Sequence, residues 1–287
     1  LTGETIAVDG AGYLATGGAL EVTVDNSYED WLPSMNLAWS VHDDVVLRFG
    51  AAKVMARPQL PNLSPGGTGN TTPRTITTGN PFLQPFRADT FDFSAEWYFA
   101  EDSLLSAALF YKDIGTYIQN LRETRPFYTT GLPDSLLPPG MPNDTPFEIT
   151  SAVNTPGGPL QGYELNYQHA LRFLPGIWSN FGVLLNYTHV ESEIDYAISP
   201  TSNTYVTANL VNLSPDAYNA TLYYEDDKFS ARVSGAYRDD YLQRVPGQNS
   251  NDVEDKRSTF NVDMSMTYNF SASLALTLEG INLTDEF

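Results

Sequence analysis

The strongest constraint on the fold is a strand pattern that recurs along the chain and is clearest in residues 91–117. From Phe91 to Phe99, apolar side chains alternate with polar ones. A period of two is typical of a β-strand that has one apolar and one polar face. The polar tripeptide at 101–103 interrupts the alternation, which then resumes. This stretch therefore predicts two antiparallel strands joined by a tight turn.

The lengths of the strands and of their connections distinguish between two kinds of all-β protein. In a soluble sandwich the apolar face packs on a second sheet, whereas in a membrane barrel it contacts lipid. Both arms of the 91–117 hairpin reach the length of about 9–11 residues that a spanning strand needs. Short links, such as those at 43–44 and 226–228, alternate with polar stretches that we predict to be long loops, at 58–87, 119–159, 192–212 and 243–258.

This alternation of short and long links is typical of outer-membrane barrels, which have short periplasmic turns and long extracellular loops. The sequence therefore predicts an all-β fold, an antiparallel transmembrane β-barrel of which roughly ten strands are present. Residues 1–30 are expected to be loop with the end of one strand. A soluble all-β binding module is the alternative from another class of protein.

Composition excludes several functions. The 287 residues carry a formal net charge of −20, which argues against nucleic acid as a partner because phosphate binding needs clustered Lys and Arg. The apolar runs are shorter than the roughly 18 residues of a membrane helix. Cysteine is absent, so thiolate metal sites are excluded. The 17 tyrosines suit the aromatic belts of a membrane interface.

Several segments between Trp31 and Phe287 resemble the C-terminal barrel half of TonB-dependent outer-membrane receptors. The resemblance is carried by WLPSMNL, AAKVMARPQLPNLSPG, TGNPFLQPFRADTFDFSAEWYF, AALFYKDIGTYIQ, GPLQGYELNYQ and GINLTDEF. Within this family, the sequence is most similar to the proteobacterial branch associated with carbohydrate uptake. It implies that residues 1–287 are the C-terminal portion of such a barrel, and that the N-terminal plug domain and the closing strand lie outside this sequence.

The resemblance also implies a function and a set of partners. We expect a receptor in the outer membrane of a Gram-negative bacterium that takes up a nutrient, with a carbohydrate as the first candidate and a siderophore as the alternative. The expected partners are outer-membrane lipid, a small-molecule or oligosaccharide ligand, and the TonB energising complex, which acts through the N-terminal region. We expect no enzyme activity, no bound cofactor and no metal site. An outer-membrane esterase using Ser192 and His189 is a third hypothesis, because the two residues are near one another in sequence.

Candidate ligand contacts come from two groups of residues. Polar side chains opposite the apolar stripe would line a solvated lumen, and aromatic side chains in the long loops could stack on sugar rings. The candidates are Lys112, Glu164, Asn166, Arg238 and Asp240 from the strands and Phe127, Tyr128 and Tyr205 from the loops. Arginines 74, 87, 122 and 125 are the counter-indication, because together they could form a basic patch, completed by the half of the barrel outside this sequence, that suits an anionic iron chelate.

Overall fold

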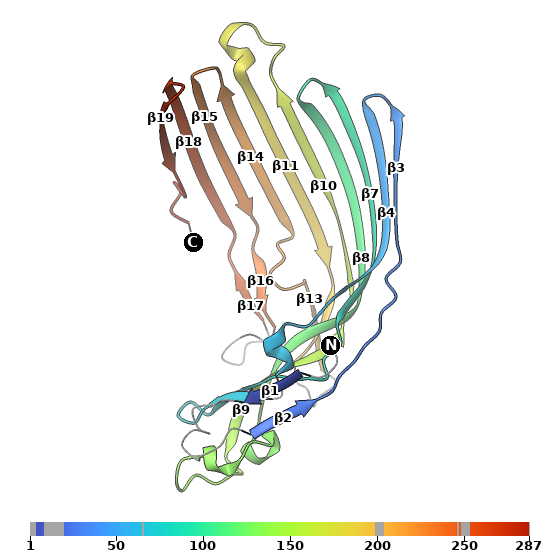
Figure 1. The fold of residues 1–287 in the computed structure, drawn as a ribbon, viewed down its shortest axis with the longest axis vertical. Coiled ribbons are helices and arrows are strands. Elements are labelled where there is room, and N and C mark those ends of the chain that lie inside the picture. The colour runs from blue at the N-terminus through green and yellow to red at the C-terminus, as the bar shows by residue number, and fades with distance from the viewer. Residues whose placement is uncertain are drawn as a thin grey trace.

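The computed structural model describes residues 4–8, 20–64, 66–198, 204–245, 247 and 253–286. Its main feature is a curved antiparallel wall of ten strands in the order β19-β18-β15-β14-β11-β10-β8-β7-β4-β3 (Figure 1). The wall strands are β3 (Ser34–His42), β4 (Val45–Ala56), β7 (Phe86–Ala100), β8 (Ser103–Pro126), β10 (Pro159–Ala170), β11 (Phe181–Ser192), β14 (Asp216–Glu225), β15 (Phe229–Arg238), β18 (Thr259–Ser271) and β19 (Leu274–Gly280). The predicted all-β fold and its ten spanning strands are confirmed.

The connections between wall strands differ at the two ends of the sheet. At the upper end in Figure 1, neighbouring strands are joined by short turns, the longest of which contains the 3₁₀ helix η4 (Gly176–Asn180). At the lower end the links are long. The wall is open, since β3 and β19 at its two ends are not paired with each other in the part of the chain that the structure describes. In that same part, no helix is long and apolar enough to cross a membrane.

One face of the wall is apolar and is bordered by two rows of aromatic rings. The row near the long links has rings that neighbour one another across the strands, such as the exposed Tyr218 and the half-buried Tyr237, whose centroids are 4.5 Å apart. The row near the short turns includes Phe181 and Tyr224, with centroids 5.0 Å apart. On β7 the two rows are represented by Phe91 and Phe99. These residues are eight positions apart, which is roughly 26 Å along the strand at about 3.3 Å per residue. This is the scale of the apolar band of an outer-membrane barrel.

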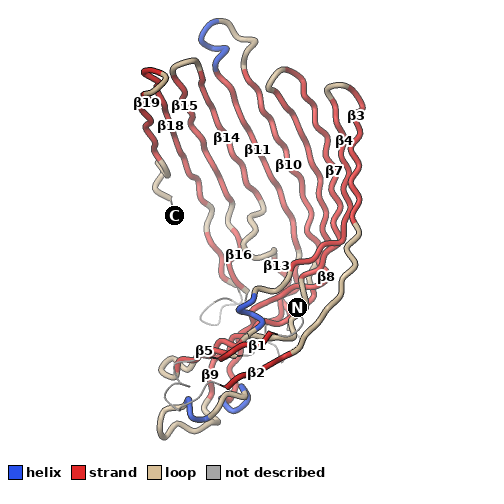
Figure 2. The backbone as a smooth tube through the Cα atoms, in the orientation of Figure 1, coloured by secondary structure: helices blue, strands red, loops and turns tan. Residues whose placement is uncertain are grey.

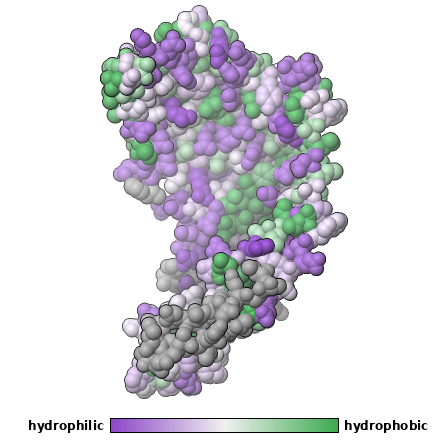
Figure 3. Space-filling view, in the orientation of Figure 1, coloured by the Kyte–Doolittle hydropathy of each residue, from purple (hydrophilic) through white to green (hydrophobic). Residues whose placement is uncertain are grey.

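The other face of the wall is polar. The central strands β11 and β14 are drawn fainter in Figure 1 than β3 and β4, so the wall curves around a concave face that is turned toward the viewer. In the same orientation Figure 3 shows mostly hydrophilic residues over the upper part of this face. Strand register places Asn166, Asn186 and Asn219 side by side on it, because each pairs with the next across β10, β11 and β14. A solvated lumen explains this polarity without burial of the polar groups.

The long links contain more regular structure than the sequence predicts. A small sheet consists of β5 (Gly67–Asn70), β6 (Thr75–Thr78), β9 (Pro146–Pro156) and the outer half of β8, with β6 and β9 parallel (Figure 2). Three short 3₁₀ helices accompany it: η1 (Leu60–Leu63), η2 (Phe127–Thr130) and η3 (Asp134–Leu136). Three two-stranded ribbons complete the described elements: β1 (Glu4–Val8) with β2 (Leu20–Val24), β12 (Ile194–Ala197) with β13 (Tyr205–Ala208), and β16 (Tyr241–Arg244) with β17 (Glu254–Lys256).

The prediction that these stretches are loops without strands is therefore wrong, and the reason is burial. Ile76, Phe127, Phe147 and Ile149 form a closed cluster in which each residue is at most 2% exposed. A second cluster joins Ile194, Tyr196, Leu242 and Val245 from two different links. Each segment contributes only one or two apolar residues, which is too few for a periodic signal but enough for a shared core.

Candidate ligand-binding site

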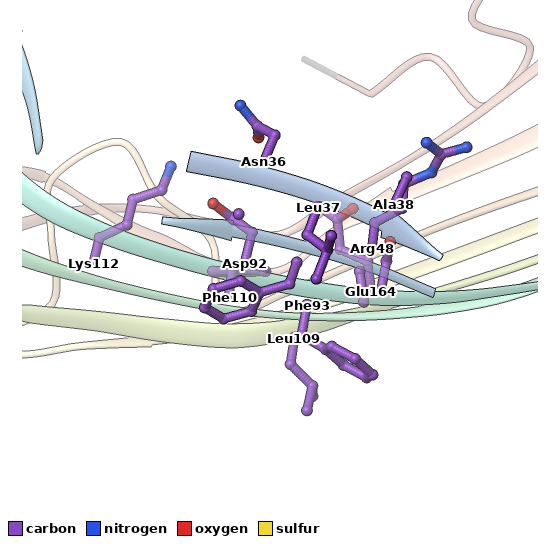
Figure 4. Close-up of a pocket in the computed structure, with 14 residues that line it drawn as sticks. Asn36, Leu37, Ala38, Arg48, Asp92, Phe93, Leu109, Phe110, Lys112 and Glu164 are labelled. Atoms are coloured by element: carbon purple, nitrogen blue, oxygen red, sulfur yellow. The ribbon is translucent and has the colours of Figure 1, made fainter. Parts of the chain in front are cut away.

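The lumen face of the wall has a hollow of about 580 Å³ that contains two of the predicted site residues, Lys112 and Glu164. Asn36, Arg48 and Asp92 line it as well. In Figure 4 the side chains of Asn36, Arg48 and Lys112 lie on one side of the strands, whereas Leu109 lies on the other. Arg48 donates from Nε to Glu96 Oε1 at 2.8 Å, so one of the two basic side chains of the hollow is already paired. The hollow is an open depression in the wall with both signs of charge.

Two other predicted strand residues have structural partners. The side-chain amide of Asn186 donates to Asn166 Oδ1 at 2.5 Å, within the polar row of the wall. Arg238 donates to the backbone oxygen of Asn212 at 2.6 Å and to Ser214 Oγ at 2.7 Å. It therefore holds the link that precedes β14 in place.

Asp240, which was also predicted, lies directly beyond the end of β15 and is exposed. Its backbone N–H donates to Asp239 Oδ1 at 2.9 Å. The carboxylate of Asp240 therefore stands at the outer end of the wall, away from the hollow on the lumen face.

The three predicted loop aromatics lie in different environments. Phe127 is 2% exposed and its ring packs on Phe147 at a centroid distance of 5.2 Å. A buried ring has no free face for a sugar, so the expectation for Phe127 needs correction: it is a core residue of the outer sheet. Tyr128 and Tyr205 are 58% and 48% exposed, and they belong to separate links, η2 and β13.

The two residues of the esterase hypothesis are on opposite faces of β11. Ser192 is buried, and its Oγ accepts the backbone N–H of Leu210 at 2.8 Å. His189 Nδ1 lies 2.9 Å from Asp216 Oδ1. Residues three apart on a strand point to opposite sides, so this serine and this histidine do not form a catalytic pair.

A second concavity, at the outer end of the wall, brings together segments that are far apart in the sequence. This outer pocket has a volume of about 480 Å³. Its walls come from the outer half of β8, from β6 and β9, from the ribbon strands β12 and β16, and from the link before β14. The polar side chains that line it are mostly amides, hydroxyls and guanidiniums: Thr77, Gln119, Asn120, Arg122, Thr150, Asn212, Gln243 and Arg244.

Gln119 holds the floor of the outer pocket together. Its Nε2 donates to the backbone oxygens of Ala197 at 2.8 Å and Val245 at 3.2 Å, and its Oε1 accepts the N–H of Ala197 at 3.0 Å. The side chain is 4% exposed, so these bonds form away from solvent, where unpaired polar groups are costly. One amide of the wall thus joins β12 to the segment after β16.

A pair of tyrosines supports the same floor. The rings of Tyr117 and Tyr196 meet edge to face at a centroid distance of 5.9 Å. The hydroxyl of Tyr196 donates to Asn209 O at 3.1 Å and accepts the N–H of Val211 at 2.9 Å. Burial raises the pKa of Tyr196 above its ordinary value, with a further contribution from Tyr117. Tyr196 is therefore neutral, and it fixes the link that carries Asn212.

The charges at the outer pocket are largely compensated. Arg122 Nε lies 3.3 Å from Glu148 Oε1, and Arg244 Nη1 lies 4.0 Å from Glu254 Oε2. The four arginines named as a possible basic patch are not gathered on one face of the described structure. Arg122 and Arg125 are three residues apart on β8 and lie on opposite faces, and Arg87 pairs with Asp30 at 2.6 Å.

Sequence reasoning named Arg122 only as part of a possible basic patch and missed the amides of the outer pocket. Asn and Gln are common in polar loops, so nothing in their spacing distinguishes a lining residue from a solvated one. One residue could have pointed to the pocket. Gln119 is a polar residue in the part of β8 that continues beyond the lipid-facing stripe.

An antiparallel wall with one lipid-type face, one polar face and folded links at a single end defines an outer-membrane β-barrel. Residues 4–283 match the model of the family described as TonB dependent receptor-like, beta-barrel. The chain belongs to this family. Its members are outer-membrane receptors of Gram-negative bacteria, and this chain is part of such a protein.

Solved structures with the same fold include three receptors. A mutant of the ferric enterobactin receptor PfeA from Pseudomonas aeruginosa aligns with a TM-score of 0.58 at 16% identity, covering 90% of this chain and 35% of that one. The siderophore receptor PirA from Acinetobacter baumannii gives 0.58 at 17%, covering 90% and 37%. PirA from Pseudomonas aeruginosa gives 0.59 at 15%, covering 90% and 39%. The chain thus spans a little over a third of the length of these receptors. No curated protein matches it in sequence.

Proposed function

We propose that the protein to which this chain belongs takes up an oxygen-rich organic nutrient across the outer membrane, with a carbohydrate as the first candidate, and that uptake is energised by TonB. The proposal rests on one observation, the outer pocket. Four links that are distant in sequence contribute to it together with β8, and its lining offers many hydrogen-bond donors, with the guanidiniums of Arg122 and Arg244 as its charged groups. Amides and hydroxyls suit the hydroxyl groups of a neutral sugar, because they donate and accept at once.

The charge pairing at this pocket supports a carbohydrate over a strongly anionic ligand. An anion would be attracted by an uncompensated basic vestibule. Here Glu148 and Glu254 accompany Arg122 and Arg244. The formal net charge of −20 adds to the same effect.

A ferric siderophore is the second candidate, because the pocket does contain two guanidiniums. The receptors with the same fold are described as ferric enterobactin and siderophore receptors. Their sequence identity to this chain is 16% and 17%. At this identity the similarity shows a shared fold and does not identify the ligand.

Uptake by cells that produce the intact receptor tests the proposal. We expect accumulation of a labelled oligosaccharide in cells with a working TonB complex, and none in cells without TonB or without the receptor. Binding of the purified intact receptor to ferric enterobactin and to oligosaccharides, by isothermal titration calorimetry, separates the two candidates. Binding of the chelate with no binding of any saccharide would overturn the carbohydrate assignment.

A further inference from the structure

The small outer sheet has one open face whose side chains form a regular polar row. Strand register aligns Thr68 with Thr77, Thr77 with Thr150, and Thr150 with Arg122. Paired residues of neighbouring strands lie on the same face, so these four side chains run in a line across β5, β6, β9 and β8. With strands about 4.8 Å apart, the row is roughly 14 Å long.

The opposite face of this sheet is its packing face. Ile76 and Ile149, which are paired across β6 and β9, are buried there with Phe127 and Phe147. The sheet is therefore stabilised from one side only. The threonine row is not needed for that core, and Thr68 and Thr77 are exposed.

The polar groups of the open face are available to a ligand. The side chains of Thr68, Thr77, Thr150 and Asn120 form no hydrogen bond with another residue that the structure describes. A depression of about 400 Å³ lies over them, and its lining contains no charged residue. Hydroxyls and amides supply its polarity: Asn62, Ser64, Thr68, Thr77, Thr78, Asn120, Thr150 and Ser151.

This neutral depression is continuous with the outer pocket. Thr77, Asn120 and Thr150 line both. Together they form a trough that is uncharged at the β5 end and has Arg122 and Arg244 at the other. Each of these arginines meets its carboxylate partner while still partly exposed, at 34% and 41% of the side chain. Such partly exposed pairs are weak, so a single ligand carboxylate can share these guanidiniums at small cost, while Glu148 and Glu254 still offset the attraction of a multiply charged anion.

We propose that the trough binds a linear oligosaccharide with an acidic unit at one end. Uncharged sugar units lie along the threonine row, and the carboxylate of the acidic unit meets Arg122 and Arg244. This inference rests on the proposed carbohydrate uptake and specifies its substrate class. A compact ferric chelate at the guanidinium end would leave the hydroxyl row unused, whereas an extended hydroxylated chain uses both ends.

Binding by the intact receptor tests the inference with three probes: linear trisaccharides that carry one uronic acid at an end, their carboxyl-reduced neutral counterparts, and the uronic acid as a free monosaccharide. We expect a uronic-acid trisaccharide to bind at least about tenfold more tightly than its reduced counterpart. Arg122→Gln should abolish that preference, because a charged hydrogen bond contributes about 1.5–3 kcal/mol, or at least a factor of ten.

The second arm tests the row itself. The double variant Thr77→Val with Thr150→Val keeps the side-chain shapes and removes two hydroxyls. We expect it to weaken trisaccharide binding about tenfold or more, at roughly 1 kcal/mol for each lost bond, and to leave binding of the single uronic acid unchanged. Thr72→Val, in the exposed turn between β5 and β6, is the matched control and should change neither.

The outcomes separate the inference from the function on which it rests. If saccharides bind but the double variant or the reduced sugars behave like their controls, the trough assignment is wrong and carbohydrate uptake stands. If only ferric enterobactin binds, the carbohydrate function fails and the trough assignment fails with it.

Discussion

Replacing Gln119 with leucine should loosen the outer pocket while leaving the wall folded. The substitution leaves three buried backbone groups without a partner: the N–H and C=O of Ala197 and the C=O of Val245. An orphaned buried polar group costs about 1–3 kcal/mol. Because the pocket admits water close by, we take the lower value, which totals about 3 kcal/mol. Local opening of this layer should then become roughly 100-fold more frequent.

Amide hydrogen exchange of the intact receptor, followed by mass spectrometry, measures this opening. We expect faster exchange in peptides that contain β12 and β16, and unchanged exchange in peptides from the lipid-facing parts of β14 and β15. Gln243→Leu is the matched control, since Gln243 lines the same pocket, is exposed and forms no hydrogen bond with another described residue. Equal protection of β12 and β16 in Gln119→Leu and the wild type would refute the reasoning.

Three further predictions concern the wall, the outer core and a turn. Leu222→Arg, at a lipid-facing position that is 50% exposed, should destabilise the barrel in vesicles by about 2–4 kcal/mol in urea titrations. Asn219→Arg, on the lumen face, should cost little, and equal losses of stability would contradict the assignment of faces. Phe147→Ala should lower the free energy of opening of the outer sheet, measured by hydrogen exchange, by about 3–5 kcal/mol. The exposed control Tyr128→Ala should lower it by less than about 0.5 kcal/mol, and similarly small effects of both variants would argue against the buried cluster. Backbone N–H groups that bond to Asp226 lower its pKa, so its stabilising effect is present at pH 7 and is lost as the pH falls through that lowered pKa. The thermal midpoints of wild type and Asp226→Ala should therefore differ at pH 7 and draw together as acid protonates the carboxylate, and a difference that does not change with pH would count against this.

The wall could be predicted from the sequence because the pattern that defines it is local. On β18, apolar residues from Phe260 to Phe270 alternate with polar ones, and a period of two has only one simple structural interpretation over that length. The position of the lipid-facing stripe follows from the same alternation. The alternation of short and long links then indicated which end of the wall carries the long links.

The site could not be predicted because long-range contacts assemble it. Gln119 meets Val245 across 126 positions of sequence, and no periodicity relates the two. Phe127 looked like an available loop aromatic, yet it packs in a core with three other buried residues, which come from β6 and β9. Charge counting likewise treated Arg122 and Arg125 as one patch, whereas strand geometry places them on opposite faces.

The central claim is that the two faces of the wall lie in different solvents, lipid on one side and an aqueous lumen on the other. The sequence contains no cysteine, so single cysteines on β18 can carry a spin label in the intact receptor reconstituted in lipid vesicles. Accessibility to oxygen should peak at Val262, Met264 and Met266, and accessibility to a water-soluble nickel reagent should peak at Asn261 and Ser265. A nickel signal of equal height at all five positions would contradict the claim.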